Sequence, residues 1–580
     1  MLEFIQTLKQ RYHAVLSRVD EMHPLWYEYQ RRIEQLIYAE AFIRKGELLE
    51  QEAAFPLQIA VIGPTQAGKS SVVNTLLGRD LAGVSPLAGY TVHPQGFCNQ
   101  RSIADCKGLQ YYFGRFQQLS AEQLSPERYD CYSLAENNAS STLLPPCVLW
   151  DTPDFDSIDA VDYREGVIRT IALADIIILV VSKEKYADQS VWEMMKTIEA
   201  FAQPTIICLN KLTPDSESSI MTSLQEKWLH TRQDVFPQLI PLHFDKHKGS
   251  PAWPADKTQA LMDCRQQVAR NKHALHCHQL LSRFWDDWLE PAHAELNAAE
   301  QWRHMVDQSI AQALEEYQRD YLNHPHYYDT FQEALVELLN LLEIPGLSRI
   351  LGTTRRIVTW PVRQLINLGR KNTLDGVSHE VTLLEQLATH VLIQLSEKIL
   401  ENIETDTLNR EWWQDAAAVL RQQKNKLQGR FVQEAGKYHE QFQQDVEQTA
   451  KRLYHELEQH PMLLNTLRTT RASTDATALA AAIYGGGIGL HDLVLTPAML
   501  SITSLLAESA VSSFMSKQEA ELKRHQLQTV KQRLFEDQLQ HALNVIPQQL
   551  PVEKRFNISA QQLKQAEEQL NEKRNGLRIL

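Results

Sequence analysis

One short stretch reads Gly63-Pro64-Thr65-Gln66-Ala67-Gly68-Lys69-Ser70-Ser71 and lies between two apolar runs, Leu57–Ile62 and Val72–Leu77. This order predicts a strand, a glycine loop and a helix, which is the context in which the pattern G-x-x-x-x-G-K-[ST] binds phosphate. The glycines let the backbone wrap closely around phosphate oxygens, and the following helix points its N-terminal amides at the anion. The stretch therefore predicts a nucleotide-phosphate site.

Individual residues of this loop have separable expected roles. Lys69 is expected to neutralise the β- and γ-phosphates, and the Ser70 hydroxyl to ligate Mg²⁺. Gln66 is the candidate for positioning the attacking water through its amide. The alternative is a glycine-containing turn that matches the pattern by accident, which the flanking strand and helix disfavour.

Composition limits the class of protein. A chain of 580 residues is too long for one ordinary core, so two or three domains are expected. A formal net charge of -14 argues against general nucleic-acid binding, and no nucleic-acid partner is expected. The seven cysteines show no C-x-x-C pair, and the N-terminal residues do not resemble a secretory signal. We expect a cytoplasmic protein.

The pattern of apolar residues divides the chain into three parts. Residues 1–50 predict N-terminal helices that pack with the C-terminal helical bundle, and residues 55–245 alternate apolar strands with helices. That alternation predicts an α/β P-loop domain with a mostly parallel sheet covered by helices on both faces. Residues 246–580 predict a large all-α bundle or stalk, with helical periodicity over 260–289, 292–322, 381–408, 412–457 and 518–545.

Two stretches differ in composition from these periodic helical segments. Leu335–Lys371 mixes basic residues with Leu, Ile, Val and Trp, which suits an element lying in an anionic lipid interface. Ala476–Met515 is small and apolar, but Asp492 and Glu508 leave too few consecutive apolar residues for a spanning helix, which needs about 20. Either stretch could instead be a buried hairpin or an oligomer interface, with Leu335–Lys371 the stronger candidate for membrane contact.

Two later strand ends carry polar residues that suit the same nucleotide site. Asp151-Thr152-Pro153-Asp154 follows the predicted strand 147–150, and Asn210-Lys211-Leu212-Thr213 follows the predicted strand 205–209. They stand where GTPases have the D-x-P-G element and the base-reading [NT]-K-x-D element. Asp151 is then the candidate for the water shell of Mg²⁺. Thr91 is the candidate switch threonine for Mg²⁺ and γ-phosphate, with an ordinary loop threonine as the alternative.

These motifs resemble the dynamin superfamily of large GTPases. Gly68–Ser71, Gly78-Arg79-Asp80 and Thr91-x-x-Pro94 are similar to dynamin's GKSS, GRD and T-R-R-P in the same order. The long interval between Thr91 and Asp151 resembles the insertion that enlarges dynamin GTPase domains. The motif-level likeness covers about residues 57–213, and the helices on both sides resemble the family's bundle and stalk. The resemblance implies a Mg²⁺-dependent GTPase that self-associates and remodels or tethers membranes.

The sequence departs from the family pattern at identifiable positions. Asp154 replaces the glycine of D-x-P-G, which places an acidic side chain near the γ-phosphate. Thr213 replaces the aspartate that would accept two hydrogen bonds from guanine, and Asp215 lies close enough in sequence to substitute for it. Thr65 and Gln66 occupy the loop positions where dynamin has catalytic residues, and the last base-contacting loop is expected after residues 239–243.

The sequence thus predicts a dynamin-like enzyme that hydrolyses GTP with Mg²⁺ and couples hydrolysis to self-assembly and to membrane remodelling or tethering. We expect this enzyme to be cytoplasmic or peripheral at the inner face of the membrane. Two alternatives are a soluble regulatory GTPase acting on a protein or ribosomal partner, and a nucleotide-binding scaffold with little hydrolysis. The predicted catalytic residues are Gln66, Lys69 and Thr91, and the predicted metal-side residues are Ser70, Thr91 and Asp151. The predicted nucleotide-binding residues are Gly63, Pro64, Thr65, Gln66, Ala67, Gly68, Lys69, Ser70, Ser71, Asn210, Lys211 and Thr213.

Overall fold

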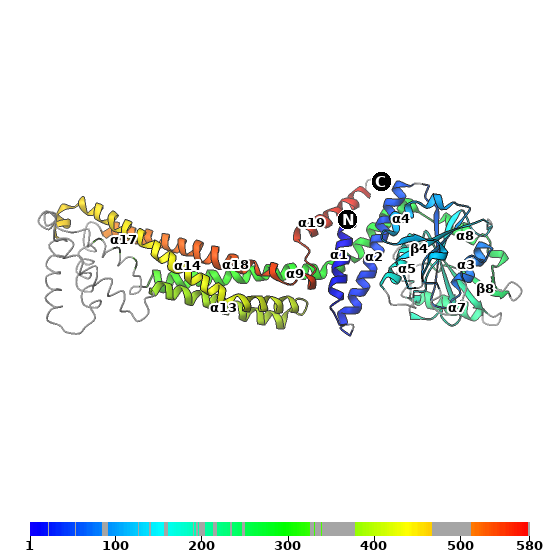
Figure 1. The fold of residues 1–580 in the computed structure, drawn as a ribbon, viewed down its shortest axis with the longest axis horizontal. Coiled ribbons are helices and arrows are strands. Elements are labelled where there is room, and N and C mark those ends of the chain that lie inside the picture. The colour runs from blue at the N-terminus through cyan, green and yellow to red at the C-terminus, as the bar shows by residue number, and fades with distance from the viewer. Residues whose placement is uncertain are drawn as a thin grey trace. The chain divides into compact units, whose positions relative to one another are not determined.

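The computed structural model divides the chain into two compact units, Met1–His293 with Val552–Leu580, and Ala294–Pro551. We call them the nucleotide unit and the helical unit, and each is described by itself (Figure 1). The structure describes residues 1–20, 22–52, 54–83, 91–125, 127–138, 141–155, 161–189, 191–192, 195, 203–212, 217–231, 235–245, 250–324, 330, 334, 338, 378–466 and 512–577.

The nucleotide unit is built on a 9-stranded sheet with the order β3-β4-β2-β5-β1-β6-β7-β8-β9. β2 pairs antiparallel with β5 and β9 pairs antiparallel with β8, while the other neighbouring strands are parallel. The strands are β1 (Leu57–Ile62), β2 (Gln95–Asn99), β3 (Gln117–Leu119), β4 (Cys131–Asn137), β5 (Cys147–Asp151), β6 (Ile176–Ser182), β7 (Thr205–Leu212), β8 (Gln238–Asp245) and β9 (Ser250–Ala252).

Helices bury the apolar side chains of the central strands. Alternate residues of β1, Ile59 and Val61, share one core with Val72 and Leu76 of α3, because successive side chains of a strand point to opposite faces. The helices of this domain are α3 (Lys69–Leu77), α4 (Gly108–Phe113), α5 (Val161–Leu173), α7 (Glu217–Thr231) and α8 (Ala260–Gln266). The predicted α/β fold with a mostly parallel sheet, followed by a large helical region, is confirmed.

The N-terminal helices α1 (Leu2–Leu16) and α2 (Pro24–Gln51) belong to the nucleotide unit. Every residue from Leu36 to Ile43 of α2 is buried, which is typical of a helix surrounded by protein on all sides. Around it lie α1, α4 and α5, together with the first part of α9 (His273–Tyr317). Trp288 of α9 donates a hydrogen bond from Nε1 to Gln35 Oε1 at 3.0 Å, and its carbonyl accepts one from Tyr12. The helix α19 (Ala560–Leu577) also belongs to this unit.

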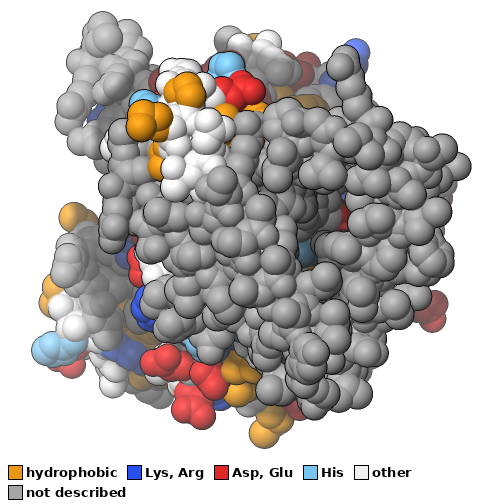
Figure 2. Space-filling view, turned by 90° about the vertical axis from the view of Figure 1, so that its left-hand side faces the viewer, with side chains coloured by type: hydrophobic (Ala, Val, Ile, Leu, Met, Phe, Trp, Pro, Cys, Tyr) orange, Lys and Arg blue, Asp and Glu red, His pale blue; other side chains and the backbone are white. Residues whose placement is uncertain are grey.

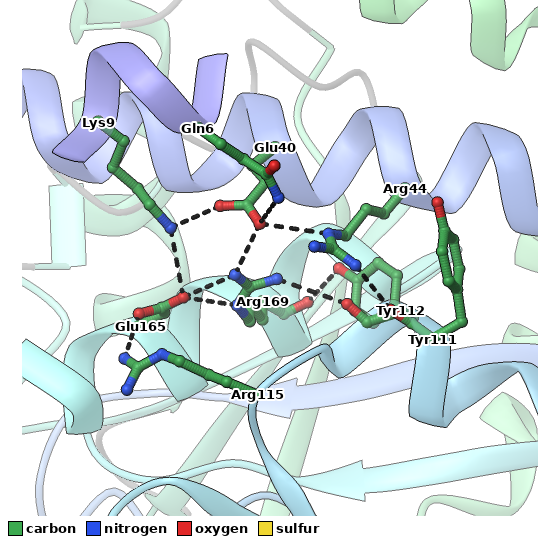
Figure 3. Close-up of polar contacts among 9 residues, drawn as sticks. All are labelled: Gln6, Lys9, Glu40, Arg44, Tyr111, Tyr112, Arg115, Glu165 and Arg169. Carbon is green, nitrogen blue, oxygen red and sulfur yellow. Dashed lines mark hydrogen bonds and ion pairs between the residues drawn. The ribbon is translucent and has the colours of Figure 1, made fainter. Parts of the chain in front are cut away.

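A buried ion cluster, formed by Lys9, Glu40, Glu165 and Arg169, lies between α1, α2 and α5 (Figure 3). Arg169 contacts Glu165 at 2.6 Å and Glu40 at 3.1 Å, and Lys9 contacts both carboxylates. Burial would raise the pKa of Glu40 and Glu165, but the charges of Arg169 and Lys9 outweigh it and lower both pKa values to about 2. The carboxylates are therefore ionised, and the cluster fastens α2 to α5.

A second ionic contact fastens the other end of α5 to α2. Asp175, just after α5, contacts Lys45 of α2 at 3.0 Å and Arg270 at 2.5 Å, and it accepts a hydrogen bond from the Gln58 amide. Lys45 also donates to the carbonyl of Ala174 at 2.9 Å. Because both ends of α5 are paired with α2, we expect these two helices to move as one body.

The helical unit consists of long helices packed side by side. They are the second part of α9, α13 (His379–Thr405), α14 (Arg410–Glu458), α17 (Ser512–Thr529) and α18 (His541–Asn544), with π-helical segments at Gln318–Leu322 and Val530–Gln540. One continuous core contains Trp302, Leu392, Trp413, Tyr438 and Phe535. Helix α9 continues through Pro291, which lies between the two ranges of helical periodicity 260–289 and 292–322. A proline removes a helix hydrogen bond, but Leu289 and Ala292 on either side of it are buried and hold the helix together.

One carboxylate is buried inside the helical unit. Glu380, at the start of α13, accepts hydrogen bonds from Tyr317, Tyr438 and Gln526 at 2.7, 3.1 and 2.8 Å, and lies 2.9 Å from the His439 ring. These partners come from α9, α14 and α17, so the carboxylate joins the helices of the unit near the start of α13.

The two segments predicted to contact membrane lie largely outside the described residues. Of Leu335–Lys371 only Leu338 is described, and of Ala476–Met515 only Ser512–Met515. Within the described parts of the chain, none of the helices combines the length and apolar character needed to cross a membrane.

Candidate nucleotide-binding site

The predicted site residues come together at the carboxyl edge of the sheet, at the ends of β1, β5 and β7. The phosphate loop follows β1, Asp151 ends β5, and Asn210 and Lys211 lie near the end of β7. Ligands of open α/β sheets bind at this edge, where neighbouring connections leave the sheet in different directions. The order β5-β1-β6-β7 therefore places all three elements around one loop.

Two glycines allow the phosphate loop to lie close to its neighbours. A Cβ at Gly63 would lie 2.2 Å from the carbonyl oxygen of Val180, so any side chain there would push the loop off β6. Gly68 has φ +90°, and a Cβ at this residue would lie 2.3 Å from Asn210 Nδ2. Both positions need glycine for sterics, and at Gly68 the left-handed backbone adds to that need. Helix α3 begins directly afterwards at Lys69.

The Lys69 ammonium points back into the loop and has three acceptors. Nζ donates to the carbonyl oxygens of Gly63 at 3.1 Å and Pro64 at 3.4 Å, and it also contacts the carboxylate of Asp154. The residue is 5% exposed. A buried ammonium is costly unless its donors are paired, and here a carboxylate neutralises it.

Three oxygen-bearing side chains meet at the start of α3. The Ser70 hydroxyl donates to Asp151 Oδ2 at 2.6 Å and lies 3.4 Å from the Thr91 hydroxyl. Burial raises the pKa of Asp151 to about 6, and the hydrogen bond from Ser70 and the charge of Lys69 offset part of that rise. The other carboxylate oxygen, Oδ1, is buried and has no hydrogen-bond partner among the described residues.

These side chains fit a magnesium site. Carboxylate and hydroxyl oxygens are the protein ligands that Mg²⁺ takes, usually few in number because the ion keeps several waters. Ser70, Thr91 and Asp151 supply such oxygens from three different chain segments. The buried, unpartnered Oδ1 of Asp151 is an acceptor that a hydrated cation could satisfy.

Asn210 and Lys211 brace the phosphate loop from the side of β7. Asn210 Nδ2 donates to the carbonyl of Ala67 at 2.9 Å, and Lys211 Nζ donates to the carbonyl of Gln66 at 2.7 Å. Lys211 has φ +59°, and its amide donates to Asn210 Oδ1 at 2.9 Å, which closes the turn. The strand end that was predicted to read the base therefore also fixes the shape of the loop.

The structure describes some of the remaining predicted site residues and leaves others outside the described part of the chain. Gln66 is exposed with φ +63°, Thr65 and Ser71 are half-buried beside it, and the carbonyl of Pro64 also accepts a hydrogen bond from the Ala67 amide. Thr213 lies outside the described residues, as do Asp215 and residues 246–249, where the last base-contacting loop was expected.

Several residues that hold the site together were not predicted. Thr152 donates to the carbonyl of Val61 at 2.8 Å, and Tyr163 of α5 donates to the carbonyl of Asp154 at 2.7 Å. Asn74 accepts hydrogen bonds from the amides of Leu81 and Ala82, which orders the turn after α3. Asn74 could have been suspected because it is a polar residue that directly follows the apolar pair Val72-Val73 in a helix whose apolar face is buried. Thr152 and Tyr163 carry no such signal.

Comparison with known families places this site in a defined class. Residues 58–211 match the model of the family described as 50S ribosome-binding GTPase. The fold, the phosphate loop and this match together define a P-loop domain of the GTPase class. The tRNA modification GTPases MnmE of Rickettsia bellii (strain OSU 85-389) and Rickettsia canadensis (strain McKiel) are 54% and 52% identical to the chain over 48 residues. That stretch is 8% of this chain and 10% of each relative, so the chain spans about a tenth of the curated relatives it matches.

The match to the GTPase family covers this domain of the chain, and bacterial dynamins are among the solved structures that the chain matches. One is described as "An oligomerised bacterial dynamin pair provides a mechanism for the long range sensing and tethering of membranes"; it is 12% identical, with 100% of this chain and 91% of that chain covered and a TM-score of 0.31. The other, "LeoA bacterial dynamin GTPase from ETEC", is 12% identical, with 94% and 97% covered and a TM-score of 0.20. The whole-chain likeness is loose in both.

Proposed function

We propose that this protein is a dynamin-like GTPase that hydrolyses GTP with Mg²⁺ and couples turnover to self-association and to membrane tethering or remodelling. The observation that carries the nucleotide part is the convergence of Lys69, the Ser70–Thr91–Asp151 oxygens and Asn210 on one loop at the sheet edge. The proposed likeness to dynamins rests on the order of the sequence motifs and on the long helices that follow the GTPase domain.

In this proposal each residue of the site has a role in binding or orienting the nucleotide. Gly63–Gly68 wraps the phosphates, Lys69 neutralises them, and Asn210 keeps the loop in shape while Lys211 lies over it. Ser70, Thr91 and Asp151 would hold Mg²⁺, which when bound supplies positive charge to the phosphate oxygens. Gln66, exposed at the tip of the loop, remains the candidate for orienting the attacking water.

The coupling part of the proposal is supported by α5. This helix begins shortly after Asp151 and Asp154, and the ion cluster and the Asp175 contacts fasten both of its ends to α2. A change in the segment after β5 that depends on the γ-phosphate would therefore move α2 along with α5. The N-terminal helices would therefore respond to the nucleotide state together with α5.

Membrane contact is proposed through residues 335–371. The helices that flank this segment in the chain, α9 and α13, meet at Glu380. Figure 2 shows the molecule from the left-hand side of Figure 1. The described side chains visible there are of mixed type, with hydrophobic and acidic groups side by side, so the proposal rests on the basic and apolar sequence of 335–371.

Nucleotide-dependent sedimentation with anionic liposomes tests this function, with GTP turnover measured in the same samples. The proposal predicts that the protein pellets with liposomes and that turnover per molecule rises with liposomes or with protein concentration. A protein that stays in the supernatant with GTP, with GDP and without nucleotide, while still hydrolysing GTP, would be a soluble regulatory GTPase. A protein that binds GTP without single-turnover hydrolysis would be a scaffold.

A further inference from the structure

Asp154 reaches the phosphate loop from the connection between β5 and α5. Its carboxylate contacts the Lys69 ammonium, and the two residues are 8% and 5% exposed. The sequence pattern of the resembling family has glycine at this position, so the contact is a property of this chain's own residue.

The three acceptors of Lys69 differ in how easily they can be exchanged. An ammonium has three N–H donors. Two of them point to the carbonyls of Gly63 and Pro64, which belong to the loop backbone and cannot leave without unfolding the loop. The third points to Asp154, whose carboxylate can swing away by rotation about its side-chain bonds. A phosphate oxygen that approaches Lys69 from the side of Asp154 therefore takes the place of this carboxylate.

The backbone of Asp154 is held by protein hydrogen bonds, whereas its carboxylate is held by the Lys69 ammonium. Its carbonyl accepts a hydrogen bond from the buried Tyr163 hydroxyl at 2.7 Å, and two residues earlier Thr152 is tied to the Val61 carbonyl at 2.8 Å. Tyr163 in turn packs edge-on against Tyr129, with ring centroids 5.8 Å apart. The carboxylate consequently stays close to Lys69 even after it has been displaced.

The position of this connection points to the terminal phosphate. In P-loop GTPases the lysine and the metal ion both reach the β- and γ-phosphates, and the segment after the metal-side aspartate is ordered by the γ-phosphate. Asp151 contacts Ser70, and Asp154, three residues further along the same connection, contacts Lys69. The Asp154 carboxylate thus lies on the side of Lys69 that the γ-phosphate of GTP would approach.

We propose that Asp154 sets the nucleotide preference of the site by competing with the γ-phosphate of GTP for Lys69. This inference rests on the proposed guanine-nucleotide site. The β-phosphate that both nucleotides carry can reach Lys69, but only GTP brings a γ-phosphate to the side of Lys69 that Asp154 occupies. Only GTP must therefore lie beside the negative charge of the carboxylate. The site accordingly favours GDP over GTP, and the carboxylate acts as an internal substitute for the terminal phosphate.

The test is equilibrium binding of two fluorescent probes, mant-GDP and the non-hydrolysable mant-GMPPNP, to the full chain with Mg²⁺. Asp154→Asn keeps the size of the side chain and removes its charge, and Asp154→Gly supplies the glycine of the resembling motif. Asp256→Asn removes the same charge from an exposed carboxylate of the same unit and serves as the control. Thermal unfolding of each variant checks that it is folded.

The proposal predicts that both Asp154 variants shift the ratio of the two dissociation constants toward mant-GMPPNP by about tenfold or more, while Asp256→Asn leaves the ratio unchanged. An unchanged ratio in both folded variants would overturn it. Equal tightening of both probes would also overturn it, because Asp154 would then oppose any phosphate. If the wild-type protein binds neither mant-GDP nor mant-GMPPNP, the proposed function fails first and the inference with it.

Discussion

Two of the places at which charged side chains are buried in the nucleotide unit differ in the kind of partner that they have. In the ion cluster between α2 and α5, Glu40 and Glu165 are held by Arg169 and Lys9, and both carboxylates are matched by fixed cations. At the edge of the sheet, Lys69 is held partly by a carboxylate that can rotate away. Beside it, one oxygen of Asp151 has no partner among the described residues.

This difference separates a structural cluster from a binding site. A buried charge whose partners are all protein groups stabilises one arrangement, and removing one partner strands the other charge. A buried charge with an exchangeable or missing partner can accept a ligand without rearranging the backbone. The two places therefore respond differently to substitution: the ion cluster through stability and the sheet edge through nucleotide affinity.

The largest expected effect is the loss of nucleotide binding caused by Lys69→Ala. The variant removes the cation that would neutralise the phosphates, so binding of mant-GDP and mant-GMPPNP should be lost within the measurable range, while the unfolding temperature changes little. Fluorescence titration and thermal unfolding measure the two quantities. Lys257→Ala, on the surface of the same unit, is the control and should bind both probes as the wild type does.

The second-largest expected effect is the loss of stability caused by Arg169→Met. Methionine keeps much of the apolar stem but removes one of the two cations that Glu40 and Glu165 share, the other being Lys9. The loss should lower the free energy of unfolding by about 3–5 kcal/mol. Urea unfolding measures the change. A variant as stable as the wild type would show that the cluster does not fasten α2 to α5.

Acid should weaken the same cluster. A carboxyl whose pKa is lower in the folded than in the unfolded chain stabilises the fold above the unfolded value, and that contribution disappears as the pH falls to the folded value. For Glu40 and Glu165, whose pKa values fall from 4.5 to about 2, the window is pH 4.5 to about 2. The loss should be roughly 3 kcal/mol for each carboxyl, discounted for their coupling.

The pH dependence is measured by urea unfolding at a series of pH values, with Glu40→Gln as the comparison. The variant should lose less stability between pH 4.5 and 2 than the wild type because one titrating group is gone. Parallel curves for the two proteins would contradict the assignment of the low pKa to this cluster.

The smallest expected effect is the change in stability caused by Arg115→Met. This variant is the counterpart of Arg169→Met, because both arginines contact Glu165. Arg115 contacts the same Glu165 at 2.6 Å, but its side chain is 50% exposed. Water can replace an exposed cation, so the change in the free energy of unfolding should stay below about 1 kcal/mol. A loss as large as that of Arg169→Met would mean that burial does not determine the strength of these pairs.

Much of the sheet edge could be predicted from sequence because its signals are local. The apolar runs of β1, β5, β6 and β7 and the polar residues that end them are visible as short patterns. The structure brings Ser70, Thr91 and Asp151 together as that order of motifs suggested, although the roles of these residues stay predictions.

The rest depends on contacts that no local pattern encodes. Strand β2, Gln95–Asn99, contains polar residues and pairs antiparallel with β5, so neither its pattern nor its direction could be read from the chain. The ion cluster joins residues that lie far apart in sequence; its one signal is Glu40, an acidic residue inside the apolar run Leu36–Ile43. The contact between Lys69 and Asp154 depends on side-chain conformations fixed by tertiary packing.

The most direct test of the central claim, a guanine-nucleotide site at the carboxyl edge of β1, β5 and β7, is competition for bound mant-GDP in the presence of Mg²⁺. Unlabelled GDP and GTP should displace the probe from the wild-type protein, whereas ADP and ATP at the same concentrations should not. Displacement by ADP or ATP as effective as that by GDP, or the absence of any saturable mant-GDP binding, would contradict the account.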